Sequence, residues 1–118
     1  DGIVWDQKGQ VCIDFRDENE TALARPCVLK DGDVYRMWYS YKPTHDEKSY
    51  RIGYAESEDG LDWERMDHKT GIDVSDDGWD SETVEYPYVF QHDECYYMLY
   101  NGNDYGMTGF GLAVSEPE

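Results

Sequence analysis

Apolar and polar side chains alternate along most of the chain, and this alternation predicts β-strands. Residues 34–41 show it most clearly, because the two faces of an extended segment receive different side chains there. One face carries Tyr35, Met37 and Tyr39, and the other carries Arg36, Trp38 and Ser40. No segment shows the periodicity of an amphipathic helix. We therefore expect an all-β chain.

Turn residues divide the chain into separate predicted strands. Asp31-Gly32 is a strong hairpin signal. Pro26 and Pro87 each suit the first position of a strand, where no backbone donor is needed. Gly53, inside a strand, marks a place where a neighbouring element approaches closely. The predicted strands are 24–29, 34–41, 50–56, a short edge strand at 63–66, 88–90, 95–101 and 110–115.

The chain carries the same pattern twice. Three blocks recur in the same order at nearly one offset, and a fixed period of this size is typical of repeated units that bury an apolar face against a neighbour. We place repeat one at 1–58 and repeat two at 59–118. The recurring blocks are 1–5 with 59–63, 34–40 with 95–101, and 52–58 with 110–116, at offsets of 58, 61 and 58 positions.

Each repeat describes one blade of a β-propeller, with three strands joined by turns and a short outer fourth strand. The chain begins with the Asp-Gly-x-x-Trp pattern of a fourth, outer strand, and it stops just after Ser115-Glu116, where the next Asp-Gly should appear. We therefore expect two four-stranded antiparallel repeats, with the outer strand of one blade supplied from the N-terminus. Since open blades leave unpaired edges, other copies of the chain or a longer parent protein must close the ring.

The composition bears on partners and compartment. Ten basic and 27 acidic residues give a formal net charge of −17, so we expect neither nucleic acid nor an anionic membrane as partner. Three cysteines without metal-ligand spacing predict no disulfide framework, metal site or cofactor, and a reducing cytoplasm is the expected compartment. No apolar stretch reaches membrane-spanning length, while a start without Met leaves a removed leader open.

The blade motifs resemble those of the five-bladed β-propeller glycosidases of the β-fructosidase, arabinanase and mannoside-phosphorylase type. Residues 57–63 read Ser-Glu-Asp-Gly-Leu-Asp-Trp and are similar to the S-x-D-G-x-x-W signature of their outer strands. Residues 24–26 (Ala-Arg-Pro) and 85–87 (Glu-Tyr-Pro) resemble the motifs that begin their innermost strands. The resemblance covers nearly the whole chain and about two of the five blades. It implies a propeller that binds carbohydrate at its axis and cleaves glycosidic bonds.

In that family, three carboxylates at the central ends of inner strands perform the reaction. The resemblance gives Glu85 the role of general acid, because Glu-x-Pro before an apolar run is the third family motif. Residues 24–26 lack the Asp that the second motif carries between Arg and Pro, and the first motif has no counterpart. Two interpretations stay open: a segment with acid–base glycosidase activity, and a non-catalytic carbohydrate-binding or structural, oligomerising module.

Further carboxylates precede the strand that begins after Glu85. Asp80, Glu82 and Glu85 lie within six positions of one another. Like charges this close together raise the pKa of one carboxyl group. A solvated acidic loop is the alternative interpretation for Asp80 and Glu82. Glycoside hydrolysis needs one protonated and one ionised carboxyl group at a fixed separation.

Substrate-binding candidates come from neighbouring positions. Arg25 suits a substrate carboxylate or hydroxyl, or alternatively a structural ion pair with Glu20 or Glu85. Loop residue Trp79 suits stacking on a sugar ring, as do Tyr41 and Tyr105, although most of the eleven tyrosines are expected to pack in the interior. Tyr86 and Asn101 complete the predicted substrate-binding set, which is Arg25, Trp79, Asp80, Glu82, Tyr86 and Asn101.

Overall fold

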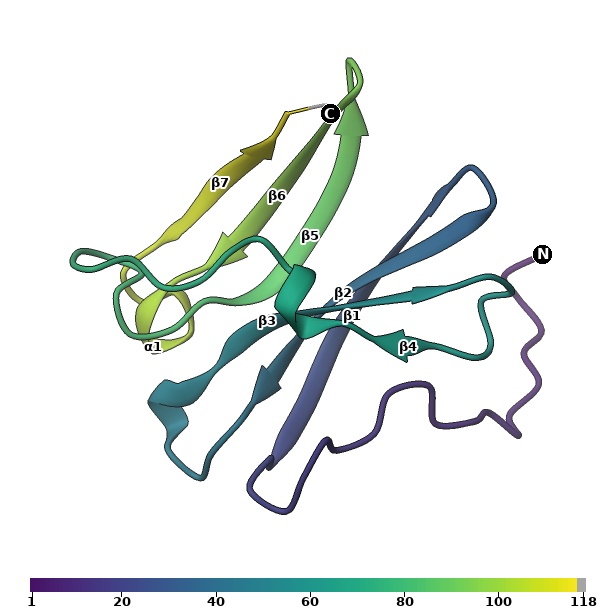
Figure 1. Cartoon of the computed structure of the whole chain (residues 1–118), viewed down its shortest axis with the longest axis horizontal. Coiled ribbons are helices and arrows are strands. Elements are labelled where there is room, and N and C mark those ends of the chain that lie inside the picture. The colour runs from purple at the N-terminus through teal and green to yellow at the C-terminus, as the bar shows by residue number, and fades with distance from the viewer. Residues whose placement is uncertain (117–118) are drawn as a thin grey trace.

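Two antiparallel sheets make up the structure, a computed structural model that describes residues 1–116 (Figure 1). Sheet A has four strands in the order β1-β2-β3-β4, and sheet B has three strands in the order β5-β6-β7. The strands are β1 (Ala22–Asp31), β2 (Val34–Lys42), β3 (Arg51–Ser57), β4 (Glu64–Arg65), β5 (Glu85–His92), β6 (Cys95–Asn101) and β7 (Phe110–Ser115). Three helical turns interrupt the connections: η1 (Glu47–Ser49), η2 (Asp67–Lys69) and α1 (Asn103–Gly106).

The predicted all-β class and the positions of the strands are confirmed. The inner strands β1 and β5 begin earlier than expected, because each continues through its proline by means of a β-bulge. The residue before each proline has a positive φ, 53° at Arg25 and 56° at Tyr86. The bulge accommodates a proline that has no donor for the strand ladder. As a result, Glu85 is itself the first residue of β5.

The two sheets pack through the faces that the alternation predicts. Ser40 is fully buried and its Oγ accepts a hydrogen bond of 2.7 Å from the backbone N–H of Tyr86. The Cys27 Sγ accepts a hydrogen bond of 3.3 Å from the N–H of Val89. The core between the sheets contains Trp38, Ile52 and Tyr54 from sheet A, Val89, Met98 and Tyr100 from sheet B, and Val84 from the connection.

The opposite face of sheet A has a smaller core of Met37, Tyr39 and Ala55. Ile13, Leu23, Tyr41 and Trp63 pack around it. Gly53 lies beneath the Tyr39 ring, and a Cβ atom at this position would lie 2.5 Å from Tyr39 Cζ. The expected close approach at Gly53 is therefore confirmed.

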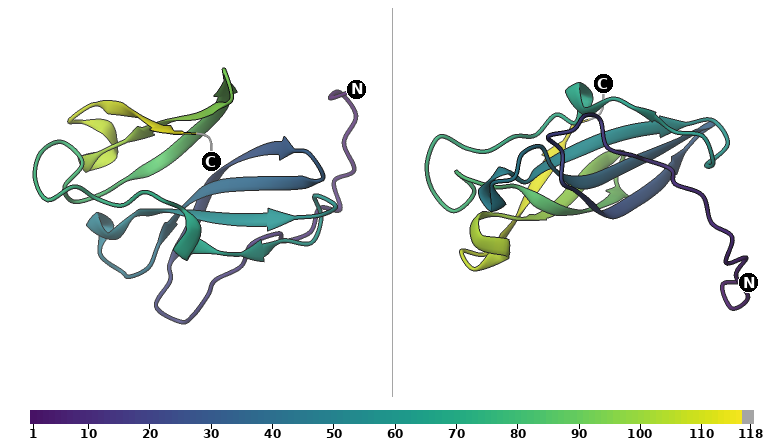
Figure 2. Two further views of the ribbon diagram at one scale, coloured as in Figure 1. Left: turned by 45° about the horizontal axis from the view of Figure 1, so that its top comes forward. Right: turned by 90° about the horizontal axis from the view of Figure 1, so that it is seen from below.

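The N-terminal segment and the outer face of sheet B lie open to solvent. Residues 1–21 contain no strand in this structure; the segment starts away from sheet A and then runs along it toward β1 (Figure 2). Ile3, Val4 and Trp5 are between 73% and 82% exposed. Sheet B likewise exposes one apolar face, with Tyr88, Phe110, Leu112 and Val114 each at least half exposed. That the N-terminus supplies an outer strand to a blade stays a prediction. The bounds of the two repeats also stay predictions, and residues 117–118 of the second lie outside the described range.

None of the helices within residues 1–116 combines the length and the apolar character needed to cross a bilayer.

Replacing Gly53 with Ala should destabilise the chain by about 1–3 kcal/mol, because the added methyl group has no space beside Tyr39. Urea unfolding at neutral pH measures this loss. Gly9→Ala is the matched control, since a Cβ at Gly9 meets nothing within 4 Å. Equal stabilities for the two variants would contradict the packing described for Gly53.

Candidate functional site

The candidate site lies where β5 begins and where β2 and β6 end (Figure 1). Glu85 pairs there with Asn101, the last residue of β6. Three connections meet around Glu85: the turn η1 after β2, the segment before β5, and the turn α1 after β6. The sheets therefore bring together residues that are far apart in the sequence.

Glu85 is a buried carboxyl group with an incomplete set of partners. The residue is 1% exposed, and its Oε2 atom has no hydrogen-bond partner among the described residues. The pKa of Glu85 is raised to about 7: burial is the main cause, a hydrogen bond from the Tyr105 backbone opposes the rise, and the negative charge of Glu47 adds to it. The carboxyl group is therefore largely protonated just below neutral pH, as a proton donor requires.

Three tyrosine rings surround this position. The Tyr86 ring lies 6.4 Å from the Tyr105 ring in a stacked arrangement and 6.5 Å from the Tyr50 ring, measured between centroids. Tyr50 and Tyr105 meet edge to face at 5.9 Å. Tyr50 is buried, whereas Tyr105 is 48% exposed. The group thus combines one buried ring, Tyr50, with one exposed ring, Tyr105, that a ligand can reach.

Arg25 comes from the equivalent bulge in sheet A and lies beside the tyrosines. Its guanidinium carbon is 4.7 Å from the centroid of the Tyr86 ring. Neither of the structural ion pairs considered for Arg25 forms, since Glu20 is instead bound by both terminal nitrogens of Arg65, at 2.6 and 2.8 Å. Arg25 is exposed and forms no ion pair within residues 1–116, which leaves its charge available to a ligand.

The two acidic candidates before β5 have different surroundings. Asp80 is buried, and its carboxylate accepts a hydrogen bond of 2.9 Å from the Tyr100 hydroxyl, so that burial and the Asp80 charge together raise the pKa of Tyr100 to about 12. Glu82 is exposed, with its carboxylate 3.5 Å from the Lys48 ammonium. The carboxylate whose charge acts on Glu85 belongs instead to Glu47, in the turn η1.

Trp79 and Asn101 both make contacts within the fold. The Trp79 indole lies 5.3 Å from the Tyr100 ring and covers Gly102 and Gly111, where a Cβ would lie 2.5 Å or less from the indole. The Asn101 amide donates a hydrogen bond of 3.3 Å to the backbone carbonyl of Tyr105. These contacts support the loops around Glu85.

Sequence reasoning missed two residues of the site and one that supports it. Glu47 lies in the turn η1 and Tyr50 directly before β3, and both lie against the tyrosine group. Asn103 is buried, and its Oδ1 accepts hydrogen bonds from the backbone N–H groups of Glu82 and Thr83, at 2.7 and 3.1 Å. It thereby fixes the approach to β5. The only available signal was the position of these residues just beyond strand ends.

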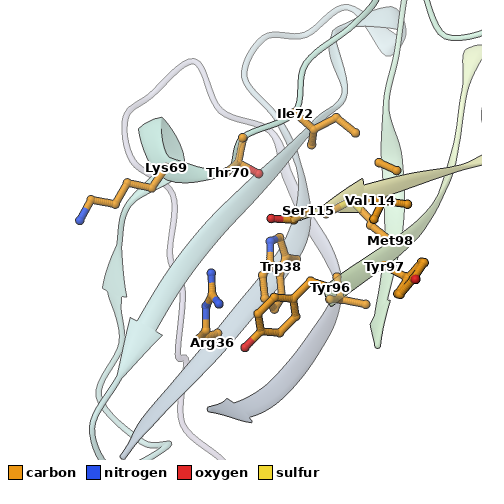
Figure 3. Close-up of a pocket in the computed structure, with 13 residues that line it drawn as sticks. Arg36, Trp38, Lys69, Thr70, Ile72, Tyr96, Tyr97, Met98, Val114 and Ser115 are labelled. Atoms are coloured by element: carbon orange, nitrogen blue, oxygen red, sulfur yellow. The ribbon is translucent and has the colours of Figure 1, made fainter. Parts of the chain in front are cut away.

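A separate cavity of about 300 Å³ lies between the sheets, away from Glu85 (Figure 3). Arg36 lines it, with its guanidinium carbon 5.1 Å from the Trp38 ring and 4.7 Å from the Tyr96 ring. Asp31 lies 3.5 Å from the same guanidinium group. Because Arg36 is already paired with Asp31 and packed against two rings, its charge is not free for a ligand. The Glu85 site is therefore the stronger candidate.

The described residues offer no evident metal centre. No three His, Cys, Asp or Glu side chains within residues 1–116 converge on a position that could hold a metal ion. The three cysteines are unpaired.

Comparison with known families gives one clear match. The model of glycoside hydrolase family 130, described as β-1,4-mannooligosaccharide phosphorylase, matches residues 15–116. The chain is 48% identical to the uncharacterized protein MT1551 of Mycobacterium tuberculosis over 116 residues, which cover 98% of this chain and 38% of that protein. It is 31% identical to the β-1,2-mannobiose phosphorylase of a Thermoanaerobacter species over 69% of this chain and 30% of that enzyme.

Comparison with solved structures supports the same fold. A structure described as a glycoside hydrolase superimposes with a TM-score of 0.71 over 94% of this chain and 32% of the other, at 22% identity. The two sheets are blades of a β-propeller like those of the propeller glycoside hydrolases. The chain spans less than two-fifths of the length of the curated relatives named above.

Glu85→Gln should stabilise the chain above about pH 7 and have little effect below about pH 4.5. Because the folded-state pKa is raised, stability present at low pH is lost as Glu85 ionises, by on the order of 3 kcal/mol at most. Urea unfolding at both pH extremes measures the difference. Glu64→Gln, at an exposed edge, is the control and should show no such pH dependence. A pH-independent effect of Glu85→Gln would contradict the raised pKa.

Proposed function

The chain belongs to the β-1,4-mannooligosaccharide phosphorylase family, glycoside hydrolase family 130, and we propose that it forms the part of a β-propeller that binds a mannoside at the propeller axis, where Glu85 is the general acid. The observation that carries this proposal is the buried Glu85 carboxyl group, whose pKa is raised to about 7, at the mouth of an inner strand. An acid with this pKa is protonated in about half of the molecules at pH 7 and in most of them below it, so a proton is available when substrate binds.

In the proposed reaction, Glu85 gives its proton to the glycosidic oxygen as the bond from this oxygen to the sugar C1 breaks. The C1 atom then forms a bond with an oxygen of the attacking group, and the released sugar leaves with the proton from Glu85. Hydrolysis by water needs a second carboxylate as base. Attack by inorganic phosphate needs none, because phosphate is already an anion. One buried acid together with a cation is therefore a suitable set of groups for phosphorolysis.

In this proposal, Arg25 binds the attacking phosphate or a hydroxyl group of the sugar. Its guanidinium group is exposed, forms no ion pair within the described residues and lies over the Tyr86 ring, which orients it. The Tyr86 and Tyr105 rings provide apolar surface for a sugar ring. Glu82 is open to hydroxyl groups, whereas Asp80, Trp79 and Asn101 support the loops.

A second candidate function is carbohydrate binding without turnover, within a structural or oligomerising module. It is favoured by residues 24–26, where Ala24 stands at the position that Glu85 occupies in the second repeat. A site with a single carboxyl group at its inner strands lacks the second carboxylate that hydrolysis needs, while its polar groups can still form hydrogen bonds with sugar hydroxyl groups.

We propose that further blades complete the ring, with repeat one at 1–58 and repeat two at 59–118. Sheet B exposes an apolar face that includes Leu112 and Val114. Packing another sheet against this face would remove its apolar side chains from water. The share of 38% of the MT1551 length is consistent with about two blades of five.

Glu85→Gln should lower kcat by about 10²–10⁴-fold on a β-linked mannobiose in the presence of phosphate, because the sugar leaving group needs the proton of the general acid. Glu64→Gln is the control and should retain full activity. Unchanged turnover in the Glu85→Gln variant would remove Glu85 from the reaction. Sugar binding by calorimetry, with no turnover in the unmodified chain, would favour the non-catalytic function.

The isolated chain should associate, because its apolar sheet face is unpaired. Light scattering coupled to size exclusion at micromolar concentration is expected to give a mass above that of one chain. A stable, well-folded monomer would contradict the requirement for outside blades.

A further inference from the structure

The loop that carries Tyr105 has a strained backbone. Asp104 and Tyr105 have φ values of 54° and 57°, in the left-handed region. This conformation is unfavourable for a residue that is not glycine, because its Cβ atom crowds the backbone. Strain of this kind persists only where surrounding contacts hold the backbone in place. Those contacts therefore indicate what the loop is positioned to do.

One of these contacts crosses from the second repeat to the first. The Tyr105 hydroxyl donates a hydrogen bond to Glu47 Oε2, which lies 58 positions away in the turn η1. The other Glu47 oxygen accepts a hydrogen bond of 2.6 Å from the Lys42 ammonium at the end of β2. Lys42 also lies over the Tyr50 ring, 5.8 Å from its centroid. The result is a continuous chain of contacts from sheet A to the α1 turn, which we call the Glu47–Tyr105 clasp.

The clasp lies against the buried acid. The titratable and charged groups that face Glu85 or its neighbour Tyr86 are Glu47, Tyr50, Tyr105 and Arg25, with Lys42 behind Glu47. Hydrogen bonding to Glu47 is also the main cause that raises the pKa of Tyr105, so the phenol stays protonated as the donor. The Tyr105 ring stacks on Tyr86, the residue next to Glu85.

We propose that Glu47 is a positioning residue, which holds the Tyr105 ring and backbone over Glu85 and so excludes water from this carboxyl group. The inference rests on the proposed role of Glu85 as the acid of the site. Its physical basis is that the left-handed turn α1 is held on one side by the Asn101 amide and on the other by Glu47, which is the contact from η1 that fixes the Tyr105 side chain. Loss of the clasp should let water reach Glu85, which favours the ionised carboxylate.

The test is a pH titration of Glu85 by carbon NMR in the full chain labelled at its glutamates, with the signal identified by its loss in Glu85→Gln. Two variants break the clasp from opposite sides: Glu47→Gln removes the acceptor charge, and Tyr105→Phe keeps the ring but removes the donor. Glu64→Gln and Tyr88→Phe are the matched controls, at exposed positions outside the clasp.

We expect the pKa of Glu85 to shift downward in both clasp variants and in neither control. A shift in Glu47→Gln alone would mean that the charge acts directly and would overturn the clasp, as would the absence of any shift. Amide exchange at Tyr105 is the second readout, expected to be faster in both folded variants; unchanged exchange overturns the proposal. Because the titration does not depend on turnover, an active Glu85→Gln variant would remove the proposed function and leave this test intact.

Discussion

Packing between the faces of sheets A and B creates the environment on which the candidate site depends. The fully buried Ser40 hydroxyl accepts the N–H group of Tyr86, and this bond ties the bulge of β5 to β2. Glu85, one residue earlier, is thereby held where water cannot solvate its charge. The raised pKa follows from burial more than from any neighbouring charge. The chemistry of the site is therefore a consequence of sheet packing.

The inner strands of the two sheets share one backbone feature. Both β1 and β5 bulge at the residue before proline, Arg25 and Tyr86 respectively, and the Arg25 guanidinium lies over the Tyr86 ring. The preceding residue is Ala24 in one sheet and Glu85 in the other. The shared bulge thus places an acid from one sheet and a cation from its neighbour at the same end of the sheets.

The sequence predicted the strands because burial on one face imposes a period of two, and the alternation through Arg36, Trp38 and Ser40 reports that burial directly. It identified Glu85 and Arg25 through short motifs and their place at strand starts. It did not find Glu47 or the buried amide of Asn103. Their roles depend on contacts between loops that are far apart in the sequence, and no local pattern in a polar segment encodes such contacts.

The central claim is that sheet packing keeps Glu85 protonated close to neutral pH. Infrared difference spectroscopy of the folded chain against Glu85→Gln tests it directly, since only a protonated carboxyl group shows the carboxylic acid C=O band. The account predicts a band at about pH 6 that belongs to Glu85 and disappears as the pH rises through about 7. A Glu85 that has lost this band by about pH 5 would contradict the account.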